Sequence, residues 1–263
     1  NGKRCQALGG AKNHALVLSD AKISQAIDQL ISAAFGSSGQ RCMALSVVMV
    51  EKKIKQPFMD NLITKVKSLK VGFQKLESNS YGPLVSDDHL NNVQNYIKLA
   101  EEEGSKIILD GREINDRRNN DKKGYFLGPT LIDSVKPNMK SYLNEIFGPV
   151  LQIIEIDDVE EGIKIINENS FGNGCCIFTE NGNNAREFSE KVDIGMVGVN
   201  IPLPVPSSFH SFGGWKNSLF GDLNIYGPDG LRFYTRRKTI TQRWFGSNDV
   251  SEINLSMPSN QKN

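Results

Sequence analysis

The chain of 263 residues has few of the residues on which several specialised protein classes depend. It contains 4 cysteines and 3 histidines, with no CxxC pair and no Cys/His spacing that would hold zinc. No apolar run approaches the roughly 20 residues that a membrane-spanning helix needs, and residues 1–15 lack the pattern of a signal peptide. The formal net charge is +1. We therefore expect a soluble globular protein with no metal, nucleic-acid or membrane partner.

The cysteines and histidines identify no site by themselves. The four cysteines are Cys5, Cys42, Cys175 and Cys176. Because neighbouring residues of a strand point to opposite faces, the adjacent pair is poorly placed for a disulfide, which favours a reducing compartment. The three histidines form no motif, and we interpret each as structural or solvated: His14, His89 and His210.

Segments with helical periodicity alternate with short β-rich runs, which is the pattern of an α/β fold. Strands are predicted at 14–18, 45–50, 106–109, 131–134, 150–155, 175–178 and 196–200. Helices are predicted at 56–69, 86–103, 159–168 and 184–192, and one more runs from residue 19 or 20 to about 36. We therefore expect a three-layer fold in which a mostly parallel sheet carries helices on both faces.

Short polar residues and glycines predict where two of these helices begin and end. Ser19 or Asp20 is the predicted N-cap of the first helix, and Ser86 that of the helix reaching residue 103, because such side chains accept from free N–H groups of the first turn. Gly36 and Gly104 are the predicted stops. Residues 112–123 form a charged, Asn-rich insertion that favours a solvated loop over a basic binding patch, since acids interrupt it.

The decapeptide at 35–44, FGSSGQRCMA, contains the most specific chemistry in the sequence. A cysteine becomes a useful nucleophile when positive charge or backbone N–H groups stabilise its thiolate, and Arg41 directly precedes Cys42 in this loop. Small residues at 36–39 also let the backbone approach a substrate closely. Free cysteines are usually small buried hydrophobes, however, so the loop alone leaves a catalytic and a structural Cys42 both open.

The flanking segments resemble the aldehyde dehydrogenase superfamily over nearly the whole chain. GQRC at 39–42 is similar to the family's nucleophile loop and EIFGP at 145–149 to its ribose and nicotinamide segment. Further similar segments are GPL at 82–84, GYFLGPT at 124–130, FGGWK at 212–216 and YTRRKTIT at 234–241. The resemblance implies that Cys42 attacks an aldehyde, that Glu145 holds the ribose hydroxyls of NAD, and that Phe147 packs near the nicotinamide. A surface carboxylate is the alternative for Glu145.

A closer resemblance concerns the branch of that superfamily that oxidises methylmalonate or malonate semialdehyde with NAD and coenzyme A. It rests on AKNHA at 11–15, AAFGSSGQRCMALS at 33–46, VGVNIPLPVP at 197–206 and the stretch 221–241. Arg41 is then expected to bind the substrate carboxylate through its guanidinium fork, with a salt bridge inside the loop as the alternative. Phe212, in the segment similar to the family's substrate wall, is the second expected substrate-binding residue.

One position bears on the second half of such a reaction. Hydrolytic members carry a glutamate four residues before the lysine that matches Lys12, and this chain has Leu8 there. Leucine cannot accept a proton from water, so the thioester is expected to pass to coenzyme A. Two alternatives remain open, a hydrolytic aldehyde dehydrogenase and a non-catalytic orphan domain that serves in assembly.

The resemblance also implies a division of the chain. Residues 1–13 are expected to end a cofactor-binding domain, 14–214 to form the catalytic domain, 215–245 to form a return segment with an oligomerisation strand, and 246–263 to be a disordered tail. Most of the NAD-binding half is then absent, and the chain alone is expected to be inactive. A homo-oligomer, dimer or tetramer, is expected, in the mitochondrial matrix if the source is eukaryotic and otherwise in the cytoplasm.

Overall fold

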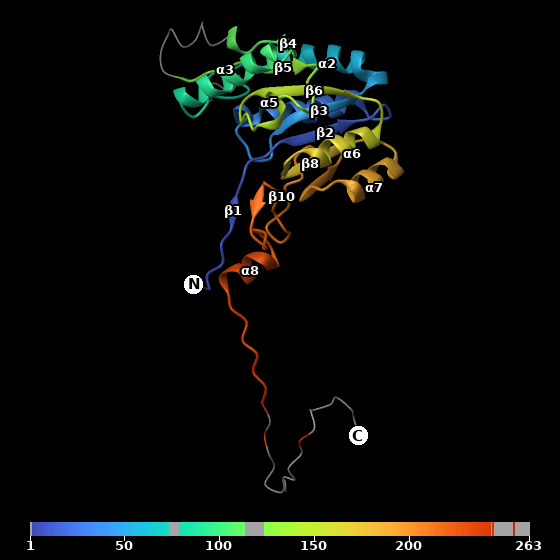
Figure 1. The fold of residues 1–263 in the computed structure, drawn as a ribbon. Helices are drawn as coiled ribbons and strands as arrows, with labels where there is room; N and C mark the ends of the chain where they lie inside the picture. Colours follow the sequence, from blue (N-terminus) through green and yellow to red (C-terminus); the bar gives the residue numbers. More distant parts are fainter. Residues whose placement is uncertain (1, 74–78, 114–123, 243, 245–254, 256–263) are drawn as a thin grey trace.

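A seven-stranded sheet lies at the centre of the structure (Figure 1). The computed structural model describes residues 2–73, 79–113, 124–242, 244 and 255. In spatial order the strands are β4 (Lys106–Leu109), β5 (Thr130–Asp133), β6 (Val150–Ile156), β3 (Leu45–Glu51), β2 (Asn13–Val17), β8 (Gly174–Phe178) and β9 (Met196–Val199). Neighbouring strands are parallel except for the edge pair β4 and β5. The mostly parallel sheet is therefore confirmed.

Helices cover both faces of this sheet, which confirms the three-layer prediction (Figure 1). On one face lie α1 (Ile23–Phe35) and α2 (Lys55–Lys67), the latter entered through the 3₁₀ turn η2 (Lys52–Ile54). On the other face lie α3 (Asp87–Glu102), α5 (Lys140–Leu143), α6 (Val159–Glu168) and α7 (Gly182–Lys191). Two separate hydrophobic clusters result, because each face of a buried parallel sheet must be covered by an apolar stripe of helix.

The alternation of strand residues between these clusters is seen in β8. Cys175 belongs to the cluster under α3 and α6, whereas Cys176 belongs to the cluster under α1 and α2. The two thiols point to opposite faces as predicted, and both are free. Burial raises the pKa of both thiols, since a thiolate is poorly solvated in the core.

One predicted helix cap is confirmed and the other is wrong. The Ser86 hydroxyl accepts from the backbone N–H of His89 at 3.2 Å and caps α3. The first helix, however, begins at Ile23 behind Lys22, with no side-chain cap. The expected cap Asp20 instead accepts from the hydroxyl of Thr179, 2.7 Å away, and therefore ties the β2 end to the β8 end rather than to a helix.

Short strands from the first and the last part of the chain pair beside the sheet. Strand β1 (Ala7–Leu8) pairs antiparallel with β11 (Leu219–Phe220), and β7 (Phe171–Gly172) pairs with β10 (Trp215–Lys216). Helix α8 (Pro228–Tyr234) follows, with no buried residue. We call β1, β10, β11 and α8, with the segments that lead into, join and follow them up to residue 242, the stem. Figure 1 shows this narrow stem leaving one side of the sheet domain. A two-residue strand near the N-terminus is thus held by residues more than two hundred positions away in sequence.

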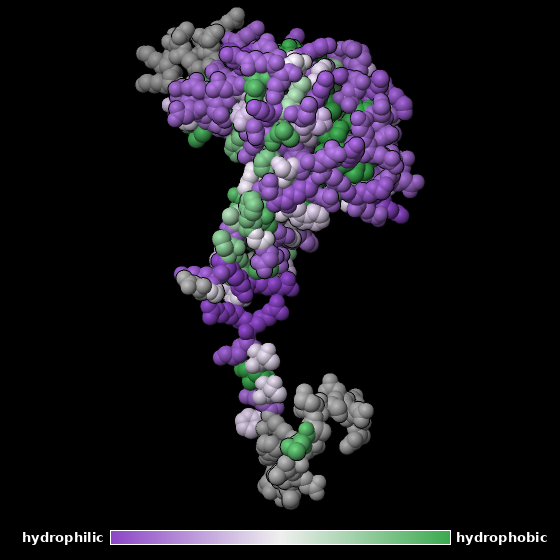
Figure 2. All heavy atoms as spheres, viewed as in Figure 1, coloured by the Kyte–Doolittle hydropathy of each residue, from purple (hydrophilic) through white to green (hydrophobic). Residues whose placement is uncertain are grey.

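The stem exposes large side chains, and Figure 2 shows hydrophobic residues, coloured green, on this part of the molecule below the sheet domain. Phe209 is 81% exposed, Leu231 71% and Tyr234 84%. Residues 235–242 form neither helix nor strand within the single chain, so the predicted oligomerisation strand stays a prediction. The division into domains likewise stays a prediction.

The predicted loop and the predicted disordered tail lie almost wholly outside the described residues. Of the insertion at 112–123 only Arg112 and Glu113 are described, and of the tail at 246–263 only Leu255. Within the described ranges, no helix combines the length and apolarity needed to cross a membrane.

Candidate functional site

The Cys42 loop begins with three consecutive residues in the left-handed region of backbone space. Helix α1 ends at Phe35, and the 3₁₀ turn η1 (Gly36–Gly39) follows, with φ of 54° at Ser37, 57° at Ser38 and 68° at Gly39. A Cβ at Gly39 would lie 2.2 Å from the carbonyl oxygen of Gly148. Only glycine therefore fits at that point, and its absence of a side chain lets the two loops meet.

The second loop is the segment that follows α5. It carries Glu145, Phe147 and Gly148, and Phe147 itself has a positive φ of 62°. Together the two loops line one small cleft, with Arg41, Cys42, Glu145 and Phe147 all on its walls. The structure therefore brings together four of the five site residues named from the sequence, although their roles stay predictions. Strained backbone at both loops is the kind of feature that functional sites retain.

The Cys42 thiol is exposed, while the carbonyl group of the same residue is held from two sides. The Asn13 side-chain amide donates to the Cys42 carbonyl oxygen at 2.9 Å and to that of Ala44 at 2.8 Å. Asn173 also donates to the Cys42 carbonyl, at 2.9 Å. Sequence reasoning assigned neither asparagine a role. The available signal was an asparagine inside the buried β2 run, where that residue type is disfavoured.

Arg41 lies on the outside of the loop. Its Nε donates to the Ser37 hydroxyl at 3.0 Å, and its guanidinium passes close over Gly36, where a Cβ would lie 2.8 Å from one terminal nitrogen. The alternative expectation for Arg41 was a salt bridge inside the loop. Among the described residues Arg41 forms this hydrogen bond and no salt bridge. The terminal nitrogens are the part of the fork that a carboxylate engages in a bidentate pair.

Glu145 lies half-buried beneath the cleft and beside a buried lysine. Its Oε1 accepts from the backbone N–H of Ala11 at 2.9 Å. Burial raises the pKa of Glu145, against the Ala11 hydrogen bond and the charge of Lys12, which lower it. Burial also lowers the pKa of Lys12 to about 7, although Glu145 opposes this. For both partners desolvation is the larger effect, so the pair is not a simple stabilising salt bridge.

Lys12 reaches two carbonyl groups at the end of α5. Its Nζ donates to the oxygens of Ser141 at 3.1 Å and Asn144 at 2.9 Å, directly before Glu145. The side chain is only 2% exposed. Lys12 therefore anchors the start of the Glu145 loop, as well as providing a charge near the carboxylate.

Phe147 is held in its left-handed conformation by a histidine of α3. The Nε2–H of His89 donates to the Phe147 carbonyl at 2.8 Å, and the two rings meet edge to face at 6.3 Å between centroids. His89 thus has a structural partner, as does buried His14, which pairs with the Tyr142 hydroxyl at 2.9 Å. Phe147 is 38% exposed as a whole residue and lines the cleft.

The fifth predicted site residue lies elsewhere. Phe212 is in the stem, where its ring packs against Tyr226 at 5.4 Å between centroids. It does not line the Cys42 cleft among the described residues. Leu8, the residue at the general-base position, lies in β1 and is 63% exposed. No described carboxylate takes its place on the cleft other than Glu145, which is bonded to Ala11.

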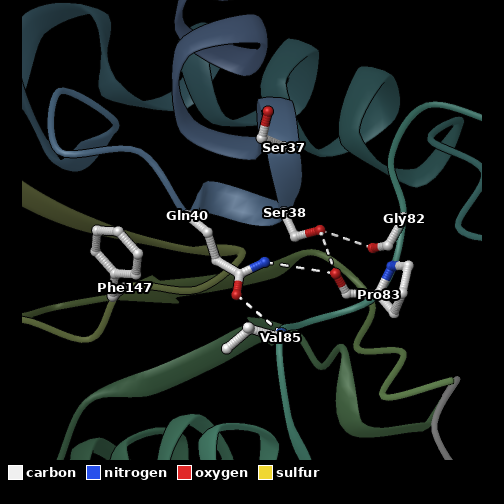
Figure 3. Close-up of a pocket in the computed structure, with 7 residues that line it drawn as sticks. All are labelled: Ser37, Ser38, Gln40, Gly82, Pro83, Val85 and Phe147. Atoms are coloured by element: carbon white, nitrogen blue, oxygen red, sulfur yellow. Dashed lines mark hydrogen bonds between the residues drawn. The ribbon is translucent and has the colours of Figure 1, made fainter.

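A larger cavity of about 590 Å³ adjoins the cleft, and Phe147 lines both (Figure 3). Figure 3 shows Ser38 and Gln40 reaching from the Cys42 loop toward the segment Gly82–Val85. The Ser38 hydroxyl donates to the Gly82 carbonyl at 2.7 Å, and the Gln40 side-chain oxygen accepts from the Val85 N–H at 3.1 Å. The polar groups of this cavity thus fix the loop. Within the described residues, no group of three or more His, Cys, Asp or Glu side chains could hold a metal ion.

Comparisons with known proteins agree with this arrangement. Residues 1–240 match the model of the aldehyde dehydrogenase family. The chain is 49% identical over 246 residues to a malonate-semialdehyde dehydrogenase of Pseudomonas aeruginosa, covering 92% of this chain and 49% of that protein. The chain thus spans about half the length of the curated relatives it matches.

Solved structures give the same result. The methylmalonate-semialdehyde dehydrogenase of Oceanimonas doudoroffii is 51% identical, with a TM-score of 0.90 over 94% of this chain and 50% of that one. A Sinorhizobium meliloti protein assigned as a methylmalonate-semialdehyde dehydrogenase, solved with NAD, is 42% identical with a TM-score of 0.88 and the same coverage. With the fold, the cysteine loop and the facing Glu145 segment all in agreement, the chain belongs to the aldehyde dehydrogenase family.

Proposed function

We propose that this chain carries the nucleophile for the NAD-dependent, CoA-acylating oxidation of methylmalonate or malonate semialdehyde to propionyl-CoA or acetyl-CoA, with loss of the carboxylate as CO2. The observation that supports this most directly is the single cleft lined by Cys42, Arg41, Glu145 and Phe147. Because the chain spans half the length of its relatives, the complete reaction is proposed for a protein of the relatives' length.

In this proposal the Cys42 thiolate attacks the aldehyde carbon and forms a thiohemiacetal. Cys42 is exposed at the surface, so a small aldehyde can reach its thiol. The new oxyanion lies next to the Cys42 backbone N–H, a donor that stabilises the negative charge as it develops. Loss of hydride from the thiohemiacetal carbon leaves a methylmalonyl or malonyl thioester on Cys42. This thioester loses its carboxylate as CO2 and gains a proton, which leaves a propionyl or acetyl thioester, and a second nucleophile then releases that acyl group.

The residues present fit the ribose and nicotinamide end of NAD. One Glu145 oxygen is held by the Ala11 N–H, and the other faces Gly10, where a Cβ would lie 3.1 Å from it. A carboxylate fixed in this way can accept hydrogen bonds from a ribose diol, and the exposed face of Phe147 can pack on an aromatic ring. NAD, when bound, supplies the hydride acceptor.

Arg41 is proposed to bind the carboxylate of the semialdehyde. Only its Nε is used in the hydrogen bond to Ser37, and the side chain is exposed beside Cys42. A guanidinium and a carboxylate form a planar, bidentate pair that would fix the aldehyde end relative to the thiol. Acyl transfer to coenzyme A is favoured because Leu8 cannot act as a base toward water, whereas a thiolate needs no such help.

The test is product analysis in a chimera that joins this chain to the N-terminal half of the Oceanimonas doudoroffii relative. With methylmalonate semialdehyde, NAD and coenzyme A, the chimera should form propionyl-CoA and NADH in equal amounts. Cys42→Ser should abolish both products, and Cys5→Ser, at the other exposed thiol, should leave them unchanged. Undiminished activity of the Cys42 variant would refute the role of Cys42. Free propionate as the main product would favour the hydrolytic alternative.

Assembly with a second copy is also proposed, from the apolar residues of the stem. Phe209, Leu231 and Tyr234 expose more side chain than soluble surfaces usually leave uncovered in one region. Residues 235–242 belong to no strand among the described residues and could add to a sheet edge of another copy. Light scattering should therefore give a dimer or tetramer, and Leu231→Asp should lower the mass. A monomer at all concentrations would contradict this proposal.

A further inference from the structure

Two asparagines far apart in the sequence converge on one backbone group of the nucleophile. Asn13, in β2, and Asn173, between β7 and β8, both donate a side-chain N–H to the Cys42 carbonyl oxygen at 2.9 Å. Asn13 is 2% exposed, and its own Oδ1 accepts from the Gly174 N–H at 3.1 Å. Each amide also bonds a second group of the loop, since Asn13 donates to the Ala44 carbonyl at 2.8 Å and Asn173 to the Met43 sulfur at 3.1 Å.

The peptide group on the other side of Cys42 is fixed independently. The Arg41 carbonyl, which shares a peptide plane with the Cys42 N–H, accepts from the Ala44 N–H at 3.0 Å. The peptide plane before Cys42 is therefore held by the hydrogen bond from Ala44 to Arg41, and the plane after Cys42 is held by the two asparagines. With both planes fixed, the direction of the Cys42 Cα–Cβ bond is constant relative to the Cys42 N–H, and only rotation about that bond moves the thiol.

We infer that Asn13 and Asn173 are positioning residues that hold the Cys42 thiol and the Cys42 N–H in the arrangement needed for acyl transfer. This inference rests on the proposed role of Cys42 as nucleophile. A reaction through a tetrahedral oxyanion needs the thiolate and the N–H to act on the same carbonyl group, so it depends on this arrangement. A simple displacement by the same thiolate forms no oxyanion and does not depend on it.

These two reactions can be compared on the intact 263-residue chain without NAD or aldehyde. p-Nitrophenyl acetate acetylates a cysteine when the thiolate attacks the ester carbonyl and p-nitrophenolate leaves, so that a thioester forms. Iodoacetamide alkylates the same thiolate with loss of iodide. Peptide mass spectrometry measures both rates at Cys42 and, as an internal reference, at exposed Cys5.

The main variant is Asn173→Leu, which keeps the size of the side chain and removes its donors. Acetylation of Cys42 should fall about tenfold, while its alkylation and both reactions at Cys5 stay within about twofold. Asn173→Asp should act in the same direction, since it too lacks the N–H. Asn13→Asp should give the larger loss of acetylation. If Asn13→Asp fails to fold, the Asn173 variants decide the question, because Asn173 is only half-buried and its replacement disturbs the core less.

The matched control is Asn167→Leu. Asn167 also joins two backbone groups, donating to the Lys191 carbonyl and accepting from the Asp193 N–H, both at 2.7 Å, but it does not contact the Cys42 loop. This variant should unfold at a lower temperature and acetylate Cys42 at the unaltered rate.

Three results would overturn the inference. The first is equal loss of acetylation and alkylation in Asn173→Leu, or no loss of either. The second is an equal loss of acetylation in Asn167→Leu, which would mean that general destabilisation is the cause. The third is acetylation of Cys42 no faster than that of Cys5 in the unaltered chain. None of these results depends on semialdehyde turnover, so failure of the proposed function and failure of this inference are distinguishable.

Discussion

Replacement of Lys12 by methionine should remove a specific dependence of stability on pH. Methionine has a similar length and no charge, so it fills the same buried space beside Glu145. In the native chain, burial lowers the pKa of Lys12 from 10.5 to about 7. The unfolded chain therefore binds more protons than the folded chain between these two values, and the free energy of unfolding rises with pH across that window.

The magnitude follows from the same two values. One pKa unit corresponds to about 1.4 kcal/mol, and the slope approaches that figure per pH unit once folded Lys12 is neutral. Between pH 6.5 and 8.5 the integrated gain for the native chain is about 2 kcal/mol. The range ends at pH 8.5, below the ordinary thiol pKa of 9.0, because above that value Cys175 and Cys176 ionise in the unfolded chain while burial keeps them protonated in the folded chain, which lowers the free energy of unfolding.

Urea unfolding followed by circular dichroism at several pH values in this range measures the effect. The Lys12→Met curve should be flatter than that of the native chain by about 2 kcal/mol over the window. Parallel curves for the two proteins would refute the view that desolvation dominates at this pair.

Four further predictions concern the loops, the helix cap and the chemistry. Gly39→Ala should lower the free energy of unfolding by about 2 kcal/mol or more in urea, because a positive φ and the Gly148 carbonyl leave no room for a Cβ. The control Gly182→Ala, with open space around it, should lower it by less than about 0.5 kcal/mol. Ser86→Ala should cost about 1 kcal/mol through loss of the α3 cap. In the chimera, Leu8→Glu should raise CoA-independent release of propionate at least tenfold, and an unchanged rate would count against a base at this position. Arg41→Gln should raise KM for methylmalonate semialdehyde at least tenfold and leave KM for propanal unchanged, and equal changes would contradict carboxylate binding.

The layered fold could be predicted because its signal is local. Strand β8 is a continuous run of apolar and small residues, β6 is apolar except for Gln152 and Glu155, and helices such as α3 carry both an apolar stripe and a capping serine. The start of α1 could not be predicted in the same way. Asp20 has the chemistry of a cap, but a hydroxyl from Thr179, 159 residues away, takes its carboxylate.

The site was predictable only in part for a similar reason. Cys42, Arg41, Glu145 and Phe147 belong to recognisable segments, and the structure places them on one cleft. The hydrogen bonds of the asparagines to the Cys42 carbonyl span 29 and 131 residues, so no local pattern contains them. The charge state of Lys12 also depends on burial, which arises only after α5 packs against β2.

The most direct test of a catalytic Cys42 is to trap its acyl intermediate. The chimera is mixed with methylmalonate semialdehyde and NAD in the absence of coenzyme A, quenched in acid and digested. The masses of the cysteine-containing peptides are then measured by mass spectrometry. We expect one propionyl group per chain on the peptide that contains Cys42, formed together with one equivalent of NADH and removed by later addition of coenzyme A. NADH formation with an unmodified Cys42 peptide would contradict the proposed reaction.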